Sequence, residues 1–169
     1  MYKESIYIND FMLASGGKRF ANYLVDTLAY YILIFLIGLI AGLLSEVFGI
    51  DGMLIWISEI NPITEIFFNV SIMVIYYLFM ESLTQRSLGK FITGTKVVLI
   101  DGSKPEAGTI GIRTLCRIIP FEQFSFLGGK ARGWHDSFSK TFVIDIAKYN
   151  AEVYRLTALS EIGQEQDKY

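Results

Sequence analysis

The sequence is poor in the residues that build metal sites, disulfides and most catalytic centres. Its 169 residues include one cysteine, Cys116, and one histidine, His135. One cysteine cannot form an internal disulfide, and no Cys/His cluster has the spacing of a zinc site. No nucleophile–base pair is evident either, which disfavours a membrane enzyme. We therefore expect no catalytic residue, no metal and no cofactor.

The chain also lacks the marks of a nucleotide- or nucleic-acid-binding protein. Its formal net charge is −2, so it has no bulk attraction for nucleic acid, and we expect no nucleic-acid partner. Gly128, Gly129 and Gly133 predict a flexible loop, but the G-x-x-x-x-G-K-[ST] pattern of a phosphate-binding loop is absent.

Apolar residues are abundant instead, and they gather in two runs. Hydrophobic residues make up 52% of the chain and charged residues 19%. The runs cover about residues 20–44 and 62–83. Since roughly 20 apolar residues cross the hydrocarbon layer as a helix, both predict spanning helices, and Pro62 suits the first turn of the second. A cleaved signal peptide is the alternative for the first run, but signal sequences have only about 7–15 apolar residues.

The basic residues predict the orientation. Lys3, Lys18 and Arg19 precede the first run, residues 45–61 have no Lys or Arg, and the other twelve of the 15 follow the second run. The positive-inside rule then places both termini in the cytoplasm. We expect an integral protein of a bacterial inner membrane.

Gly38 and Gly42 form a G-x-x-x-G pattern in the first run. Small residues four apart allow two helices to approach closely. We expect packing against the second span of the same chain, and a homodimer contact is the alternative.

The C-terminal half predicts a short ribbon and one further helix. Residues 96–100 and 141–146 are β-branched strand candidates that can pair. A helix is expected over about residues 107–127, with Arg113 and Arg117 on one face at the level of the lipid headgroups. An interfacial or re-entrant helix is favoured over a third span, because two arginines inside a span are costly. The fold class is thus a mainly helical, all-α membrane protein with two transmembrane helices and a two-stranded β-ribbon.

Asp26 is a carboxylate about two turns into the first predicted span, and it shares a helix face with Arg19 and Asn22. A bare carboxylate in hydrocarbon costs about 2.5–3.5 kcal/mol or more, so the site must compensate for the charge. Candidate cations are Arg19, Lys90, Arg113 and Arg117. The site either binds a proton or cation from the cytoplasm or forms a structural ion pair. His135 and Asp136 are expected to cap or bridge a turn, with proton transfer as the alternative.

These motifs resemble the RDD family of membrane proteins, named for one arginine and two aspartates. Arg19-Phe20-Ala21 with Asp26 resembles its opening, and Gln85–Lys90 (QRSLGK) is similar to its G/Q-x-T-x-G-K segment, with Ser87 for the usual threonine. The further similar positions are Lys96-Val97-Val98, Asp101-Gly102, Arg113, Arg132-Gly133-Trp134-His135-Asp136 and Thr141. Ser139 and Lys140 depart from the usual small residues. The resemblance implies that Arg19, Asp26 and Asp136 are the named triad and that some members exchange cations for protons.

The sequence predicts three segments of the chain and two alternative functions for the protein. We expect a cytoplasmic segment over residues 1–18, a membrane domain over residues 19–146 and a polar tail over residues 147–169 that begins helical and then frays. The protein is either part of an ion or small-solute transport system, with Asp26 as the ion-binding carboxylate and His135 and Asp136 gating it, or an accessory or assembly protein with a structural ion-pair network. Its expected partners are the lipid bilayer and either copies of itself or another membrane protein.

Overall fold

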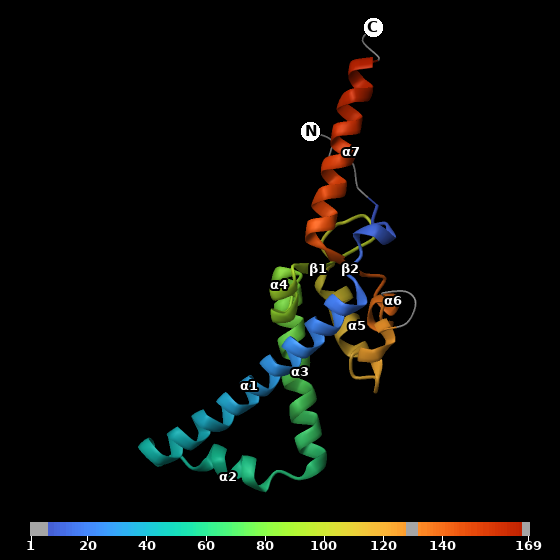
Figure 1. Cartoon of the computed structure of the whole chain (residues 1–169). Coiled ribbons are helices and arrows are strands. Elements are labelled where there is room, and N and C mark those ends of the chain that lie inside the picture. Colours follow the sequence, from blue (N-terminus) through green and yellow to red (C-terminus); the bar gives the residue numbers. More distant parts are fainter. Residues whose placement is uncertain (1–6, 128–131, 167–169) are drawn as a thin grey trace.

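The computed structural model describes residues 7–127 and 132–166, and two long helices dominate it (Figure 1). Helix α1 covers Gly16–Phe48 and is capped by Ser15, whose hydroxyl accepts from the Lys18 amide at 3.3 Å. Helix α3 covers Pro62–Thr84 and begins after the cap residue Asn61. At 1.5 Å per residue the helices are about 50 and 35 Å long, enough to cross a bilayer. Both predicted spans are therefore present.

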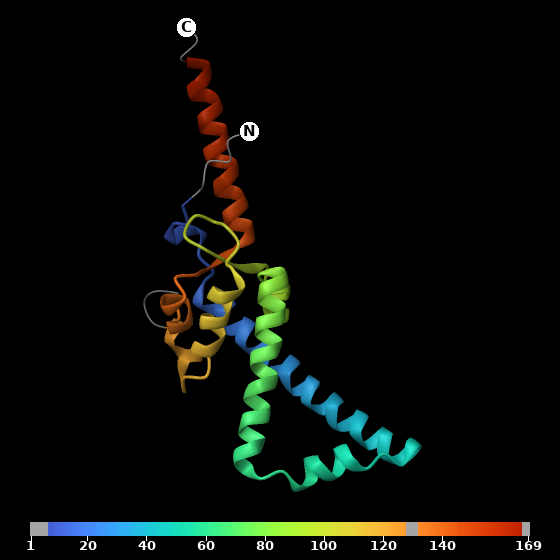
Figure 2. The same cartoon turned by 180° about the vertical axis from the view of Figure 1, so that it is seen from behind.

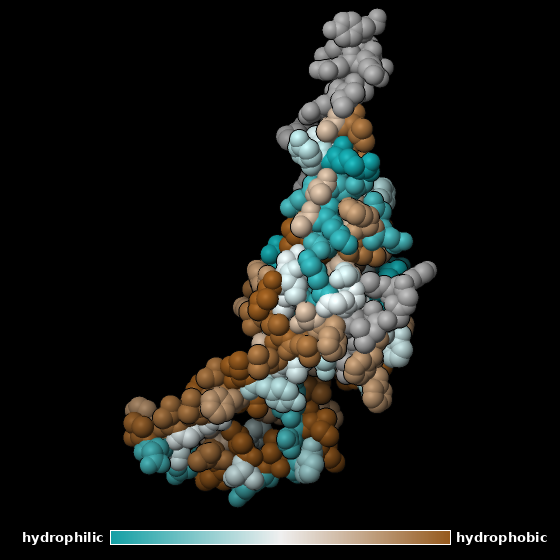
Figure 3. Space-filling view, viewed as in Figure 1, coloured by the Kyte–Doolittle hydropathy of each residue, from teal (hydrophilic) through white to brown (hydrophobic). Residues whose placement is uncertain are grey.

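The two long helices cross near one end and then diverge, and the short helix α2 (Gly52–Glu59) lies across their far ends (Figures 1 and 2). We call residues 27–48, 52–59 and 62–75 the apolar V. In the most apolar window of each long helix only 6% of residues are buried inside the protein. Figure 3 shows mostly hydrophobic surface over this part, nearly unbroken along α1 and with polar side chains among the apolar ones along α2 and α3. Such a surface is unlike the core helix of a soluble protein and fits lipid as its surroundings.

The open shape of the apolar V contradicts the expected role of the glycine pair. A Cβ atom added at Gly38 or Gly42 would meet nothing within 4 Å. The prediction that these glycines pack against the second span of the same chain is therefore wrong. The reason is that α1 packs mainly against the helix that follows α3, so the two spans separate before they reach the glycines.

The predicted β-ribbon is confirmed. Strands β1 (Thr95–Val98) and β2 (Phe142–Asp145) are antiparallel, with Val97 opposite Val143. The remaining elements of this half are α4 (Leu88–Thr93), α5 (Ala107–Cys116), the 3-10 helix η2 (Glu122–Leu127), α6 (Trp134–Phe138) and α7 (Ile146–Gln166). The polar helix α7 extends away from the rest of the protein (Figure 1) and reaches Gln166, further than expected for a fraying tail.

The chain before α1 lies against this ribbon. Its 3-10 helix η1 covers Asp10–Met12, and Leu13 forms an antiparallel bridge with Ile144. Met12 is fully buried with Ile8, Val98 and Ile144 in a small apolar core. Two strands alone would be marginally stable, and the segment before α1 adds a third extended strand segment to the ribbon.

Helix α5 is shorter than expected and faces the opposite way. It ends at Cys116 instead of continuing to residue 127, and at about 15 Å it is too short to span a bilayer. Arg113 is fully buried, whereas Ile112 and Leu115 are more than half exposed. The prediction that the arginines face the headgroups is wrong, because their carboxylate partners lie inside the protein.

Candidate functional site

Four basic side chains and two carboxylates meet where α1, α3, α4, α5 and α6 converge. We call this set the charge network: Arg19, Glu81, Lys90, Arg113, Arg117 and Asp136. Glu81, Arg113 and Asp136 are fully buried, and Arg19 and Lys90 nearly so. Buried charges persist only when they are paired and hydrogen-bonded, which these contacts achieve.

Glu81 is the centre of one half of the network. It lies near the end of α3 and accepts from Lys90 Nζ at 2.9 Å, Arg113 Nε at 3.0 Å and Arg117 Nη2 at 2.9 Å. The Arg117 guanidinium also stacks on the Tyr77 ring at 4.0 Å. One carboxylate thereby joins α3 to α4 and α5.

Asp136 is the centre of the other half. Its two carboxylate oxygens contact Arg19 and Arg113, and it also accepts from the Gly133 amide at 3.0 Å. Arg113 donates further to the Thr141 hydroxyl at 2.7 Å. Burial acts to raise the pKa of Asp136, but the neighbouring guanidinium groups of Arg113 and Arg19 hold it well below its usual range. Arg113 therefore bridges the two carboxylates and fastens α5 to α3 and α6.

His135 lies beside the network as a neutral imidazole. Burial lowers the pKa of His135 to about 4. Its Nδ1 contacts Glu122, and its Nε2 lies 3.4 Å from Arg19 Nη2. Because an arginine N–H is always a donor, Nε2 is the acceptor and the ring proton is on Nδ1. The hydrogen bond from His135 in turn lowers the pKa of Glu122, against the opposite effect of burial.

Asp26 has surroundings of a different kind. It accepts from the hydroxyls of Tyr76 at 2.9 Å, Tyr77 at 3.4 Å and Ser87 at 2.5 Å, and from the Gly89 amide at 2.8 Å. None of the ion pairs within residues 7–127 and 132–166 includes Asp26. Of the alternatives left open by the sequence, a direct pair with an arginine or lysine is therefore not what the structure has: neutral donors from α3 and α4 hold Asp26.

The backbone of α4 positions these donors, since Gly89 lies directly on α1. A Cβ atom at Gly89 would lie 2.8 Å from the Asn22 Cα. The Asn22 amide contacts the hydroxyls of Thr93 at 2.5 Å and Thr95 at 3.1 Å, so it fastens α1 to the chain between α4 and β1. Asn22 therefore supports the site without touching the carboxylate of Asp26.

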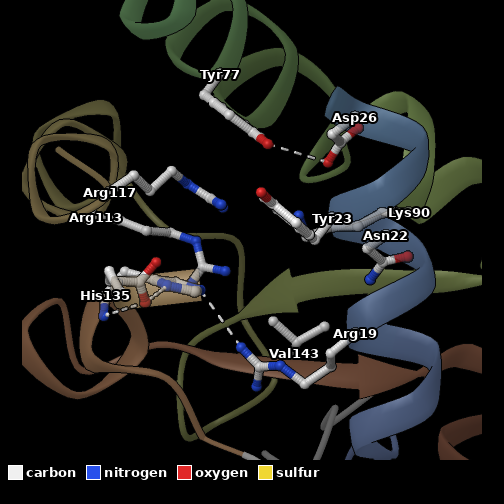
Figure 4. Close-up of a pocket in the computed structure, with 11 residues that line it drawn as sticks. Arg19, Asn22, Tyr23, Asp26, Tyr77, Lys90, Arg113, Arg117, His135 and Val143 are labelled. Atoms are coloured by element: carbon white, nitrogen blue, oxygen red, sulfur yellow. Dashed lines mark hydrogen bonds and ion pairs between the residues drawn. The ribbon is translucent and has the colours of Figure 1, made fainter. Parts of the chain in front are cut away.

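A small cavity lies among these side chains, with a volume of about 30 Å³. Figure 4 shows Arg19, Tyr23, Arg113 and Arg117 around it, with Asp26 and Tyr77 bonded at its edge. Burial lowers the pKa of Lys90, another lining residue, although Glu81 opposes this effect. Within the described part of the chain, no group of three His, Cys, Asp or Glu side chains is placed to hold a metal ion.

The structure brings all eight predicted site residues into one region, and it adds five that the sequence reasoning missed: Tyr76, Tyr77, Glu81, Ser87 and Glu122. The sequence did indicate Glu81, because it is a charged residue within an apolar run, as Asp26 is. It also follows Tyr77 by four residues, which places both on one helix face. Glu122 had no such signal, since it contacts His135 only through the fold.

Comparison with known proteins gives the family. No curated protein and no solved structure matches the chain. The model of the RDD family matches residues 13–147, which include α1 through β2 and the whole charge network. The two apolar helices and this match together show that the chain is a membrane protein that belongs to the RDD family.

Proposed function

We propose that this protein is the membrane component of an ion or small-solute transport system of the cation/proton exchange type, with Asp26 as the carboxylate that takes up the proton or cation. One observation supports this most. Glu81 and Asp136 are neutralised by cations and Glu122 lies against His135, whereas Asp26 is held by hydroxyls and one amide. Asp26 is therefore the carboxylate with negative charge available for a ligand.

The oxygen atoms around Asp26 suit such a ligand. A hydroxyl can donate to a carboxylate or turn and offer its lone pairs, so Tyr76, Tyr77 and Ser87 can serve either state. Carboxylate and hydroxyl oxygens are the ligands preferred by hard cations. Lys90 Nζ lies 3.2 Å from Ser87 Oγ, so a cation that arrives at Asp26 would repel it. Because Lys90 also pairs with Glu81, this repulsion would connect binding at Asp26 to the charge network. In this scheme His135 and Asp136 act from the cytoplasmic side as gating residues.

Two diverging spans enclose no pathway, so transport requires further helices. We propose that these come from copies of the same chain or from a partner membrane protein. The reaction is a movement of ions without covalent chemistry, so the protein is not an enzyme.

Ion flux into proteoliposomes tests the proposal. We expect the purified protein to support flux of H⁺, Na⁺ or K⁺, and Asp26→Asn to abolish it while leaving the unfolding temperature and oligomeric state unchanged. Glu65→Gln is the matched control, because Glu65 is an exposed carboxylate in the first turn of α3. Absence of flux in the unmodified protein with all three cations, or equal flux in Asp26→Asn, would contradict the proposal.

A second candidate is an accessory or assembly role. It is favoured by the closed contacts of the charge network, which fasten α1, α3, α4, α5 and α6 to one another. In this case Asp26 also serves only to join helices. Loss of folding or assembly in Asp26→Asn, without flux in the unmodified protein, would establish this second role.

We further propose that both termini lie in the cytoplasm of a bacterial cell, with α2 on the outside. The support is the absence of Lys and Arg from residues 45–61. In a Cys116→Ser background, an impermeant maleimide should label Ser58→Cys in intact cells. It should label Tyr154→Cys, on an exposed position of α7, only after permeabilisation. The reverse pattern would overturn this orientation.

A further inference from the structure

The cavity beside Asp26 is close to one water molecule in size. Its volume of about 30 Å³ equals roughly the share of one molecule in liquid water. It lies between α1, α3, α5 and β2, and its lining includes Arg19, Tyr23, Arg113, Arg117 and Val143. A single small ligand can therefore occupy it without any movement of the helices.

The cavity wall has hydrogen-bond donors in excess. Within the described residues, Arg113 Nη2 and Arg117 Nε are buried and have no hydrogen-bond partner. Arg113 is fully buried, so no bulk water reaches it. In Figure 4 its guanidinium group and the Tyr23 hydroxyl point into the space between the helices. Buried charged donors without a partner are costly, and an arginine can only donate, so the missing ligand must be an acceptor.

The hydrogen-bonding groups of the cavity wall favour an anion over a water molecule. In the charge network four cations share two carboxylates, Glu81 and Asp136. Asp26 and Glu122 also line the cavity, and their partners (hydroxyls, an amide and the neutral His135 ring) do not cancel their charge, so cations and carboxylates are equal in number around it. The two guanidinium donors without a partner decide the ligand instead, because an anion only accepts, whereas a water molecule would bring two further hydrogens to a wall of donors.

We propose that this cavity binds one small monovalent anion of halide size, held by Arg113 Nη2, Arg117 Nε and the Tyr23 hydroxyl. Spherical halides match the cavity in size and accept from several donors at once. The anion links Tyr23 of α1 to the two arginines of α5, so its binding stabilises the folded protein. The inference does not depend on the transport activity of Asp26.

Thermal unfolding of the purified full-length protein in detergent provides the first test. Sodium chloride or bromide is titrated against sodium gluconate at constant ionic strength, because gluconate is too large for the cavity. We expect the unfolding temperature to rise with the logarithm of halide concentration once the site begins to fill. Equal unfolding temperatures in halide and gluconate would overturn the proposal.

Two variants, one control variant and one direct observation locate the effect. Tyr23→Phe should weaken halide binding about 3–10-fold, the amount expected for one lost neutral hydrogen bond. Tyr31→Phe, an exposed position on the same helix, should leave it unchanged. Val143→Ile fills the cavity and should remove the halide dependence. A crystal soaked in bromide should give an anomalous peak between Arg113 and Arg117. A bromide-free cavity containing only water, or full halide dependence in Tyr23→Phe and Val143→Ile, would exclude the site.

Discussion

The apolar V and the charge network differ in which side chains face outward and which face inward. In the apolar V, the side chains that face outward are mostly hydrophobic, and the two long helices have little contact with each other (Figure 3). In the charge network the cations and carboxylates face inward, while α5 shows Ile112 and Leu115 to the outside. The V therefore depends on lipid for its shape, whereas the network is held by its own ion pairs.

Substitutions in the two regions should therefore have different consequences. A change in the V alters contacts with lipid or with another chain, because few contacts within the chain exist there to be lost. A change in the network leaves a buried charge without its partner, which is among the most costly changes in a folded protein.

Asp136→Asn should be among the most destabilising single substitutions in the charge network. It removes the negative charge shared by Arg19 and Arg113, both buried, and breaking such a pair costs about 3–5 kcal/mol. Unfolding in detergent, followed by near-ultraviolet circular dichroism, measures the loss. Asp145→Asn is the control, since Lys18, the partner of Asp145, is 40% exposed and such pairs contribute under about 1 kcal/mol. Equal effects of the two variants would refute the contrast.

Acidification should weaken the network before any carboxylate titrates. His135 has a pKa of about 4 in the folded protein and about 6.5 in the unfolded chain. The unfolded chain therefore binds a proton first, and stability that is complete above pH 6.5 falls as the pH drops towards 4, by at most about 3 kcal/mol. Asp136 and Glu122, whose pKa values are also lowered, add further loss only below their unfolded values near pH 4.

Unfolding temperatures measured between pH 7 and pH 4.5 isolate the contribution of His135. In His135→Gln, which cannot titrate, the curve should be flatter over this range. An unchanged slope in that variant would mean that another group is responsible.

Gly89→Ala should destabilise the contact between α4 and α1. The added methyl group would overlap the backbone at Asn22, and overpacking of this kind costs about 1–3 kcal/mol. Gly111→Ala is the matched control, because nothing lies within 4 Å of its added Cβ and alanine favours a helix. If Gly89→Ala unfolds at the same temperature as the unmodified protein, the close approach of α4 to α1 is not the constraint inferred here.

The sequence was sufficient to predict the elements that depend on local pattern. The two apolar runs predicted α1 and α3, and the β-branched segments predicted the pairing of β1 with β2. The sequence predicted which charged residues form the site, but not which of them bond to one another. Asp26 and Arg19 share a helix face, yet Arg19 bonds to Asp136 because α6 lies beside the start of α1 in the fold. Pairings across 117 residues depend on tertiary packing, which spacing along one helix does not describe.

The direction that α5 faces shows the same limit in another way. Its pattern of Arg113 and Arg117 on one face and Ile112 and Leu115 on the other was identified from the sequence. An amphipathic pattern does not say which face is outside, however. In water the arginines would face outward, and beside lipid, with Glu81 inside, they face inward. Recognising Glu81 as a charge within an apolar run would have supplied the missing partner.

The smallest effect within a single chain is expected for the glycines of the apolar V. The double variant Gly38→Leu, Gly42→Leu should change the stability of the monomer by less than about 0.5 kcal/mol, because an added Cβ at either position meets no other part of the described chain within 4 Å. Ala41→Leu is the control on the same stretch of α1, since Ala41 is fully buried and cannot accept a larger side chain without a shift.

The homodimer contact remains the alternative prediction for the G-x-x-x-G pattern, since small residues permit close approach of a second chain. The same double variant should therefore shift the protein from oligomer towards monomer in detergent, as measured by light scattering coupled to size-exclusion chromatography. A loss of monomer stability without any change in mass would show instead that the V closes on itself in the membrane. An unchanged mass and an unchanged stability together would leave the apolar V in contact with lipid alone, and the helices needed for transport would then have to come from a different protein.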